Sequence, residues 1–306
     1  MRTSDDFAHL PADVRPIASM DVEARIAHIR TERWVQHDSV SRLLRELQDI
    51  FDQAPRERME NLLLLGASGM GKTMLIRKFE RENAVAFDQK NGIQQKPVLV
   101  VLMPPQPTET EFFHRVLETV GAPTFQYWSN STHLRSTAIA LLRKIGTRVL
   151  VIDEINSILV GTPRQQRLFL QLLRFLSNDL RMALVGVGVP EARHALLSDS
   201  QLRSRFNDVE LSLWTPGAEL REFITRLVWS LPLRRPSPID TVKFRANLVR
   251  QSGGITLGIC KAIARAAIAS ILTGQERIEP SSFDDPEIWR GIATGNRAAL
   301  SKPAAH

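Results

Sequence analysis

Residues Asn61 to Thr73 read Asn-Leu-Leu-Leu-Leu-Gly-Ala-Ser-Gly-Met-Gly-Lys-Thr, and this stretch decides the fold. Its four leucines predict a buried strand, and the eight residues from Gly66 match the pattern G-x-x-x-x-G-K-[ST]. The glycines let the backbone turn tightly, so that successive N–H groups point inward at an anion. A helix predicted from about Gly71 to Asn83 presents its positive amino end to the same anion. The stretch predicts a phosphate-binding loop, and the alternative is a glycine-rich turn that happens to end in Lys-Thr.

The side chains that end this stretch suit a nucleotide with Mg²⁺. We expect Lys72 to reach the β- and γ-phosphates and the Thr73 hydroxyl to ligate the metal. The predicted nucleotide contacts of the loop are Gly66, Ala67, Ser68, Gly69, Met70, Gly71, Lys72, Thr73 and Met74.

Two carboxylates follow a second apolar run, Arg-Val-Leu-Val-Ile-Asp-Glu at residues 148–154. In open α/β sheets, ligands bind where the strands end. We therefore expect Asp153 to hold Mg²⁺ through water and Glu154 to act as the general base on the attacking water. An Asp-Glu pair after an apolar run says little alone, but together with the phosphate loop it predicts an ATPase site.

Composition sets broad limits on the chain. Of its 306 residues, 43% are hydrophobic and 24% charged, as in an ordinary globular protein. No apolar run is long enough to span a bilayer, and the amino terminus lacks the apolar region of a signal peptide. The single cysteine, Cys260, reads as a core residue. We expect a cytoplasmic protein without a membrane partner.

The net charge is +7, and most of the 40 basic residues are arginines. This balance permits nucleic-acid binding, with a solvated basic surface as the alternative.

The order of patterns predicts an α/β fold with a parallel central sheet, a helical segment before it and a small all-helical lid after it. Further strands are expected at Pro97–Met103, Met182–Val187 and Leu211–Trp214. The predicted divisions are a flexible arm (1–18), an α/β nucleotide-binding domain with its helical preface (19–214), a helical lid (215–291) and a flexible tail (292–306).

Two pairs of residues outside these motifs are candidates for the site. Trp34 and Val35, just before the first α/β helix, either line the adenine or simply pack. Arg203 and Arg205, one residue apart at a helix end, are an unusual pair that could also form surface ion pairs.

These motifs together resemble the AAA+ ATPases, with a P-loop NTPase domain and a lid. That resemblance implies that Arg205, or else Arg203, is an arginine finger that reaches the γ-phosphate held by a neighbouring subunit. Two positions depart from the family. The fourth strand ends at Gly188 without the usual Asn or Thr, and Leu257 stands where the lid arginine is expected, with Lys261 one turn later as a substitute. Hydrolysis of ATP is then expected to be slow or dependent on a partner.

Within this group, the chain is similar to the TniB family of transposition proteins, relatives of TnsC, over roughly residues 15–290. The resemblance rests on Arg-Trp at 33–34, the phosphate loop, Val-Ile-Asp-Glu-Ile-Asn at 151–156 and Gln-Leu-Arg-Ser-Arg-Phe at 201–206. It implies an ATP-bound ring or filament on duplex DNA that recruits a DDE transposase of the TniA type, with a TniQ-type protein as a further partner.

DNA contacts are expected to be non-specific, through phosphates, and sensitive to salt. The basic candidates near the nucleotide are Lys90, Lys96, Arg164 and Arg167, with the last two preferred. A solvated helix start is the alternative for Arg164 and Arg167.

Three other functions fit the same motifs. One is a helicase loader or initiator of the IstB or DnaA type, although no helix-turn-helix module follows the lid. Another is a secretion ATPase of the ExeA type, although no membrane or peptidoglycan-binding segment is visible. The third is a nucleotide-gated scaffold without hydrolysis, suggested by the two departures.

Overall fold

The structure is a computed structural model that describes residues 7–85, 87, 89, 92–122, 131–196 and 199–292. The chain divides into two compact units. Ser39–Ser212 form an α/β unit, and Met1–Asp38 with Leu213–His306 form a helical unit. Each unit is described separately below.

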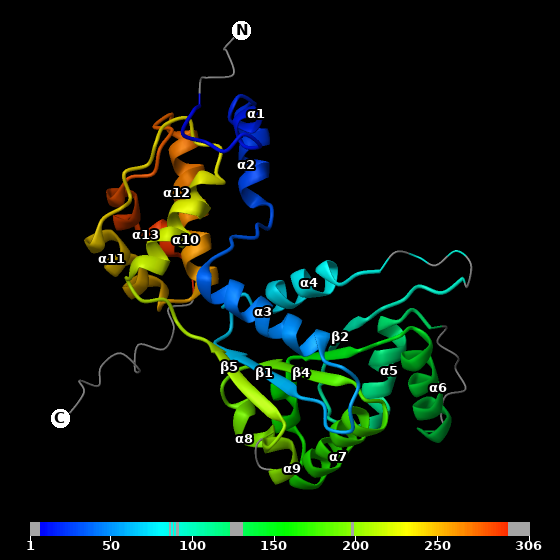
Figure 1. The fold of residues 1–306 in the computed structure, drawn as a ribbon. Helices are drawn as coiled ribbons and strands as arrows, with labels where there is room; N and C mark the ends of the chain where they lie inside the picture. Colours follow the sequence, from blue (N-terminus) through cyan, green and yellow to red (C-terminus); the bar gives the residue numbers. More distant parts are fainter. Residues whose placement is uncertain are drawn as a thin grey trace, which may run out of the picture. The chain divides into compact units, whose positions relative to one another are not determined.

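The α/β unit is built on one five-stranded sheet with the order β2-β3-β4-β1-β5 (Figure 1). The strands are β1 (Asn61–Gly66), β2 (Val98–Leu102), β3 (Val149–Asp153), β4 (Ala183–Gly188) and β5 (Phe206–Leu211). Every neighbouring pair is parallel. All strands therefore end at one edge of the sheet, called here the carboxyl edge, and begin at the opposite amino edge.

The central strands are buried and almost entirely apolar, because helices cover both faces of the sheet; Asn61 and Asp153 are the polar exceptions in β1 and β3. All six residues of β1 and all five of β3 are buried. Helices of this unit are α3 (Asp38–Asp52), α4 (Lys72–Glu82), α5 (Glu109–Thr119), α6 (Ser131–Lys144), α7 (Pro163–Asp179), α8 (Ala192–Leu196) and α9 (Ser200–Arg203), with a 3₁₀ helix η1 (Ile155–Val160). α3 and α4 lie on one face and α5 to α7 on the other (Figure 1).

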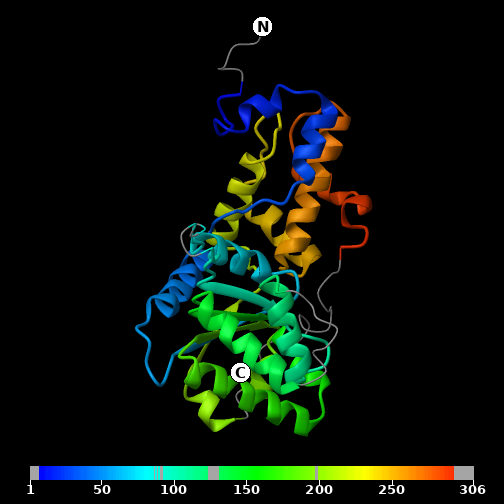
Figure 2. The same cartoon turned by 90° about the vertical axis from the view of Figure 1, so that its right-hand side faces the viewer.

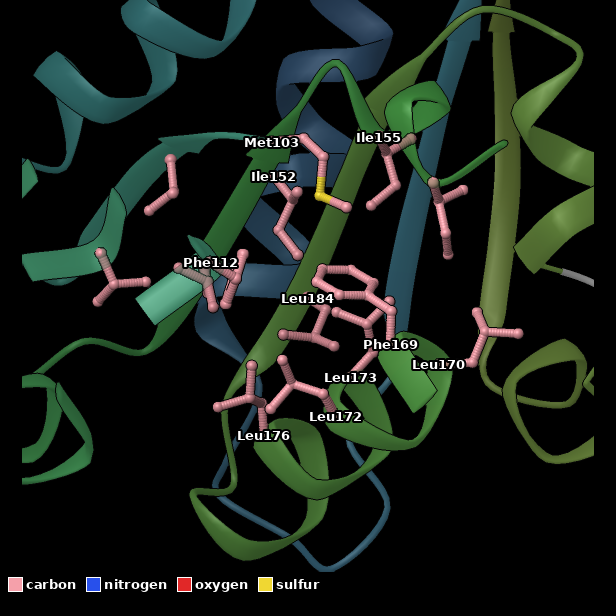
Figure 3. Packing of buried hydrophobic residues seen from close by; sticks show 14 of the residues in the cluster. Met103, Phe112, Ile152, Ile155, Phe169, Leu170, Leu172, Leu173, Leu176 and Leu184 are labelled. Atoms are coloured by element: carbon pink, nitrogen blue, oxygen red, sulfur yellow. The ribbon is translucent and has the colours of Figure 1, made fainter. Parts of the chain in front are cut away.

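A hydrophobic core lies between the sheet and α5, α6 and α7. Phe112 and Phe169 meet edge to face there, with ring centroids 5.4 Å apart. Figure 3 shows Leu184 of β4 beside Leu173 of α7, with Ile152 of β3 in the same cluster. This packing fixes the strand ends from which the site is built.

The last strand is Phe206–Leu211, so the prediction of a strand at Leu211–Trp214 is wrong. β5 lies at the edge of the sheet and pairs with β1 alone. Polar residues are tolerated on such a strand. Asp208 and Glu210 are indeed exposed and both pair with Arg193, at 2.9 and 3.2 Å. The strand therefore lacks the apolar run on which the prediction relied.

The helical unit brings both ends of the described chain together. Its helices are α1 (Arg15–Ala18), α2 (Val22–Arg30), α10 (Ala218–Trp229), α11 (Val242–Ser252), α12 (Thr256–Leu272) and α13 (Pro286–Trp289), with a 3₁₀ helix η2 (Pro280–Asp284). α2 lies beside α12 (Figures 1 and 2). Among the described residues no single helix is long and apolar enough to cross a bilayer; α11 and α12 reach that composition only together, across a break bent by 116°.

The structure divides the chain differently from the predicted domains, because residues up to Asp38 belong to the helical unit and not to the α/β unit. Arg25 of α2 explains this grouping. Its side chain is fully buried and donates to the carbonyl oxygen of Pro232 at 2.8 and 3.0 Å and to Glu276 Oε1 at 3.0 Å. A buried guanidinium needs partners of this kind, and here they come from the segments that follow α10 and α12.

Residues 7–18 also differ from the predicted flexible arm. Phe7, Leu10, Val14 and Ala18 are buried and form a small cluster. His9 adds a hydrogen bond of 3.1 Å between its Nε2 and the Leu233 carbonyl. Residues 1–6 and the predicted tail beyond Ile292 lie outside the described residues.

Candidate active site

The phosphate-binding loop joins the end of β1 to the start of α4, as predicted. Gly69 and Gly71 have φ angles of 79° and 93°, which side-chain-bearing residues rarely adopt. Gly66 is required for a different reason. A Cβ at this position would lie 3.0 Å from the Leu211 carbonyl oxygen, because β5 packs closely here. The amino end of α4 carries no side-chain cap, so its N–H groups remain available to an anion.

Lys72 is folded over this loop. Its Nζ donates to the carbonyl oxygens of Gly66 at 2.7 Å and Ala67 at 3.0 Å. Desolvation lowers the pKa of Lys72, and the carboxylates of Glu154 and Asp153 oppose that shift. The ammonium group thus faces both the loop and the two acids that follow β3.

Thr73 and Asp153 are brought together from separate segments. The Thr73 hydroxyl donates to Asp153 Oδ2 at 2.8 Å, and the Glu154 N–H donates to Asp153 Oδ1 at 2.9 Å. Asp153 is 5% exposed, whereas Thr73 is exposed. A hydroxyl and a carboxylate at this distance are oxygen ligands of the kind that Mg²⁺ selects, so the residues fit the metal.

Glu154 lies at a strained point of the backbone. Its φ and ψ angles are 57° and 40°, in the left-handed region. A non-glycine residue is held there at an energetic cost, and such residues cluster at functional sites. Its side chain is exposed at the carboxyl edge, where it is accessible to a bound nucleotide and water.

The topology places these groups around the end of β4. β4 lies between β3, which leads into Asp153-Glu154, and β1, which leads into the phosphate loop. Leu65 of β1 is paired with Gly188, the last residue of β4. The structure thus brings together the loop residues, Lys72, Thr73, Asp153 and Glu154, as predicted from the sequence.

One neighbour of this site received no role from the sequence. Asn156 of η1 packs against Gly188: a Cβ built on Gly188 would lie 2.9 Å from Asn156 Oδ1. Because a single Asn in a short apolar segment has no distinctive pattern, no sequence signal could have assigned it.

Arg203 and Arg205 lie at the amino edge of the sheet. Arg205 directly precedes β5, whose first residue, Phe206, is paired with Asn61 at the start of β1. The half-buried Arg205 side chain donates to Asn178 Oδ1 of α7, and Arg203 is exposed. They are separated from the phosphate loop of the same chain by the length of a strand.

The remaining nucleotide candidates belong to the helical unit. Trp34 and Val35 are half-buried there, and Lys261 is exposed on α12, one turn after the exposed Leu257. The contact of these residues with a nucleotide stays a prediction.

The four DNA candidates have different surroundings. Arg164 and Arg167 are exposed in the first turns of α7, which begins after η1, at the carboxyl edge. Within the described part of the chain neither forms an ion pair. Lys96 was expected near the nucleotide, but it precedes β2 at the amino edge and donates to the Thr119 carbonyl at 3.1 Å. Lys90 lies outside the described residues.

Comparisons with known proteins agree with this geometry. A family model described as "Bacterial TniB protein" matches residues 25–216. No curated protein sequence matches the chain significantly.

Several solved structures have a similar fold. Cdc6p from Pyrobaculum aerophilum has a TM-score of 0.63 at 16% identity, covering 90% of this chain and 74% of that chain. The ORC2 protein of Aeropyrum pernix, in ADPNP–ADP complexes, has a TM-score of 0.59 at 14% identity with the same coverage, 90% and 74%. The Aeropyrum pernix ORC1 protein in complex with DNA has a TM-score of 0.57 at 19% identity, covering 85% and 67%. At these identities the likeness concerns the fold.

Proposed function

Because the chain belongs to the TniB family of bacterial proteins, we propose that it is an ATP-dependent regulator of DNA transposition. Family membership and the phosphate-loop site make it an AAA+ P-loop ATPase that binds nucleotide. In the proposed function it assembles as a ring or filament on duplex DNA. The assembly then recruits a DDE transposase of the TniA type to the target site, with a TniQ-type protein as a further partner.

The main support for an ATPase site is that Lys72, Thr73 and Asp153 lie together at the carboxyl edge of the sheet. Lys72 exchanges its bonds to the Gly66 and Ala67 carbonyls for phosphate oxygens. Thr73 and Asp153 would hold Mg²⁺, which would supply positive charge to the phosphate oxygens. The free N–H groups of the loop and of α4 bind the remaining phosphate charge.

Hydrolysis in this site uses Glu154 as the base. A water molecule attacks the γ-phosphorus, its proton passes to the Glu154 carboxylate, and the bond to the bridging oxygen of ADP breaks. The exposed position of Glu154 at the carboxyl edge supports this role.

The register of the sheet supports an arginine finger that acts on the nucleotide of a neighbouring copy of the chain. Arg205 precedes Phe206, and the loop begins at Gly66, which is paired with Leu211 at the other end of β5. At about 3.3 Å per residue the two are about 20 Å apart, beyond the reach of an arginine side chain. Arg205 therefore serves the nucleotide of a neighbouring copy, and Arg203 is the second choice.

DNA contact is proposed for Arg164 and Arg167. Both guanidinium groups are exposed, and the chain has a net charge of +7. The likeness in fold to an ORC1 protein solved in complex with DNA also supports contact with a duplex. Binding through phosphates is independent of sequence and falls as salt rises.

A strand-transfer assay with a TniA-type transposase tests the regulatory role. We expect integration into duplex DNA to rise when this protein and ATP are added together, and not when ADP replaces ATP. Equal integration with and without the protein would remove the transposition role.

A helicase loader or initiator is the second candidate, favoured by the fold it shares with Cdc6p from Pyrobaculum aerophilum. An initiator of this kind prefers particular DNA sequences. Binding to one duplex at least tenfold tighter than to unrelated duplexes at equal salt would favour it over the transposition role.

A further inference from the structure

On the face of β4 that packs against η1, the end of the strand carries no side chain, although it lies in the middle of the proposed site. Gly186 and Gly188 are alternate residues of the strand that face Ile155 of η1, and both are buried. β4 lies between the strands that lead into the phosphate loop and into Glu154. A polar group at this strand end would be next to both the terminal phosphate and the base.

Asn156 occupies the space that a side chain of residue 188 would need. A Cβ on Gly188 would lie 2.9 Å from Asn156 Oδ1 and 2.9 Å from Ile155 Cγ2. Ile155 is fully buried and fixes this segment to the core (Figure 3). The left-handed backbone of Glu154, with φ at 57°, turns the chain from β3 across the end of β4.

The oxygen of the Asn156 amide, Oδ1, is buried and has no hydrogen-bond partner among the described residues around it. Buried polar atoms are nearly always paired, so an exception at a strand edge of this kind indicates a missing partner. The terminal torsion of an Asn side chain is broad, so the amide can turn toward a ligand without moving η1.

We infer that Asn156 positions the attacking water, supplying from η1 the polar group that β4 lacks. This inference rests on the proposed ATPase function. The water donates one O–H to the Glu154 carboxylate and the other to Asn156 Oδ1, which aligns its lone pair with the γ-phosphorus. As the P–O bond forms, the first proton moves to Glu154 and ADP leaves with the electrons of the broken bond. Asn156 exchanges no proton.

The test compares Asn156→Ala with Ser157→Ala, a change to the next residue of the same 3₁₀ helix. Three quantities are measured in the presence of duplex DNA and Mg²⁺: kcat for ATP, the Kd for ADP, and the Kd for ADP with fluoroaluminate. The last complex mimics the transferring phosphoryl group with its attacking water. The melting temperature of each variant is recorded alongside.

We expect Asn156→Ala to lower kcat and weaken the fluoroaluminate complex by about tenfold or more. The Kd for ADP should stay within about twofold of the wild type, and Ser157→Ala should match the wild type in all three quantities. Unchanged kcat in Asn156→Ala would overturn the inference. A parallel loss of ADP affinity and melting temperature would also overturn it, since the residue would then be structural. Absence of turnover in the wild-type protein would instead overturn the proposed function, and the inference with it.

Discussion

The Thr73 hydroxyl donates a 2.8 Å hydrogen bond to Asp153 Oδ2, joining two residues 80 positions apart in the chain. The bond connects the first turn of α4 to the end of β3, across the carboxyl edge of one parallel sheet. It places the two expected Mg²⁺ ligands side by side beside the phosphate loop. The predictions below follow from this arrangement and from the buried contacts of the helical unit.

Lys72→Ala should abolish ATP-dependent DNA binding. The change removes the buried ammonium group that faces the loop carbonyls and the acidic pair. Fluorescence anisotropy with a labelled duplex measures the effect, with Arg77→Ala on the exposed face of α4 as the control. We expect Lys72→Ala to bind the duplex with the same affinity whether or not ATP is present. That affinity should equal that of the wild-type protein without nucleotide. Wild-type binding by this variant would show that nucleotide does not control assembly.

Glu154→Gln should bind ATP normally and stop turnover, because the amide cannot accept the proton of the attacking water. The expected loss of kcat is about 100-fold or more. Phosphate release measures turnover, and a fluorescent ATP analogue measures binding. Persistent complexes on DNA are expected for this variant. Turnover at the normal rate would exclude Glu154 as the base.

Arg205→Ala should lose turnover while each subunit still binds nucleotide. Because the finger acts between copies, mixing Arg205→Ala with Lys72→Ala should restore activity: one variant keeps an intact site and the other keeps the finger. The control is Asn178→Ala, which removes the partner that holds Arg205 but keeps the arginine.

An Arg205→Ala mixture that stays inactive would argue against action in trans. Normal turnover by Arg205→Ala alone would assign the role of arginine finger to Arg203 instead.

The double change Arg164→Ala with Arg167→Ala should weaken binding to all duplexes alike. Loss of two phosphate contacts should reduce the slope of log K against log salt by about 1.8, at about 0.9 per contact. Titrations at several salt concentrations measure the slope. A matched control is Arg42→Ala with Arg45→Ala, both exposed on α3, which covers the opposite face of the sheet from α7. If the salt dependence of binding is unchanged in the Arg164→Ala and Arg167→Ala double variant, the DNA contacts another surface of the protein.

Arg25→Ala should destabilise the helical unit by about 3 kcal/mol, since it leaves Glu276 without its buried partner. Urea unfolding measures the change, and Arg30→Ala, exposed on the same helix, should have little effect.

The same ion pair predicts a pH dependence of stability. Burial alone raises the pKa of Glu276, but the hydrogen bonds and charge of Arg25, with Arg234, outweigh it and lower the pKa. A carboxyl whose pKa is lower in the folded state stabilises the fold above its unfolded pKa of about 4.3 and loses that contribution as pH falls through the folded pKa. Melting temperatures at pH 7 and pH 3.5 should therefore differ less in Glu276→Gln than in the wild type. An equal difference would contradict this role.

The site was predictable because its signals are local. The leucines of β1 and the glycines after them lie in one stretch, and the acids after β3 follow directly from an apolar run. Burial on both faces of a parallel sheet enforces such runs. The structure confirms the parallel α/β fold, whereas the roles of the residues around the phosphate loop stay predictions.

The features that the sequence did not predict depend on distant partners. Arg25 reads as a solvent-exposed charge on α2, but carbonyl and carboxylate groups more than 200 residues later bury it. Asp208 and Glu210 interrupt the apolar pattern of the edge strand β5, so the sequence does not reveal it as a strand. Their charges are paired with Arg193 of α8, which is distant in the sequence. Asn156 acquires its place only when Gly188 of β4 leaves room for it. None of these partners is adjacent in the sequence.

Electron microscopy of the purified protein with duplex DNA, with and without a slowly hydrolysed ATP analogue, tests the central claim most directly. Rings or filaments that coat DNA of unrelated sequence only when the analogue is present are the predicted result. Monomers that ignore DNA in both conditions would contradict the proposed assembly and, with it, the action of Arg205 on a neighbouring copy.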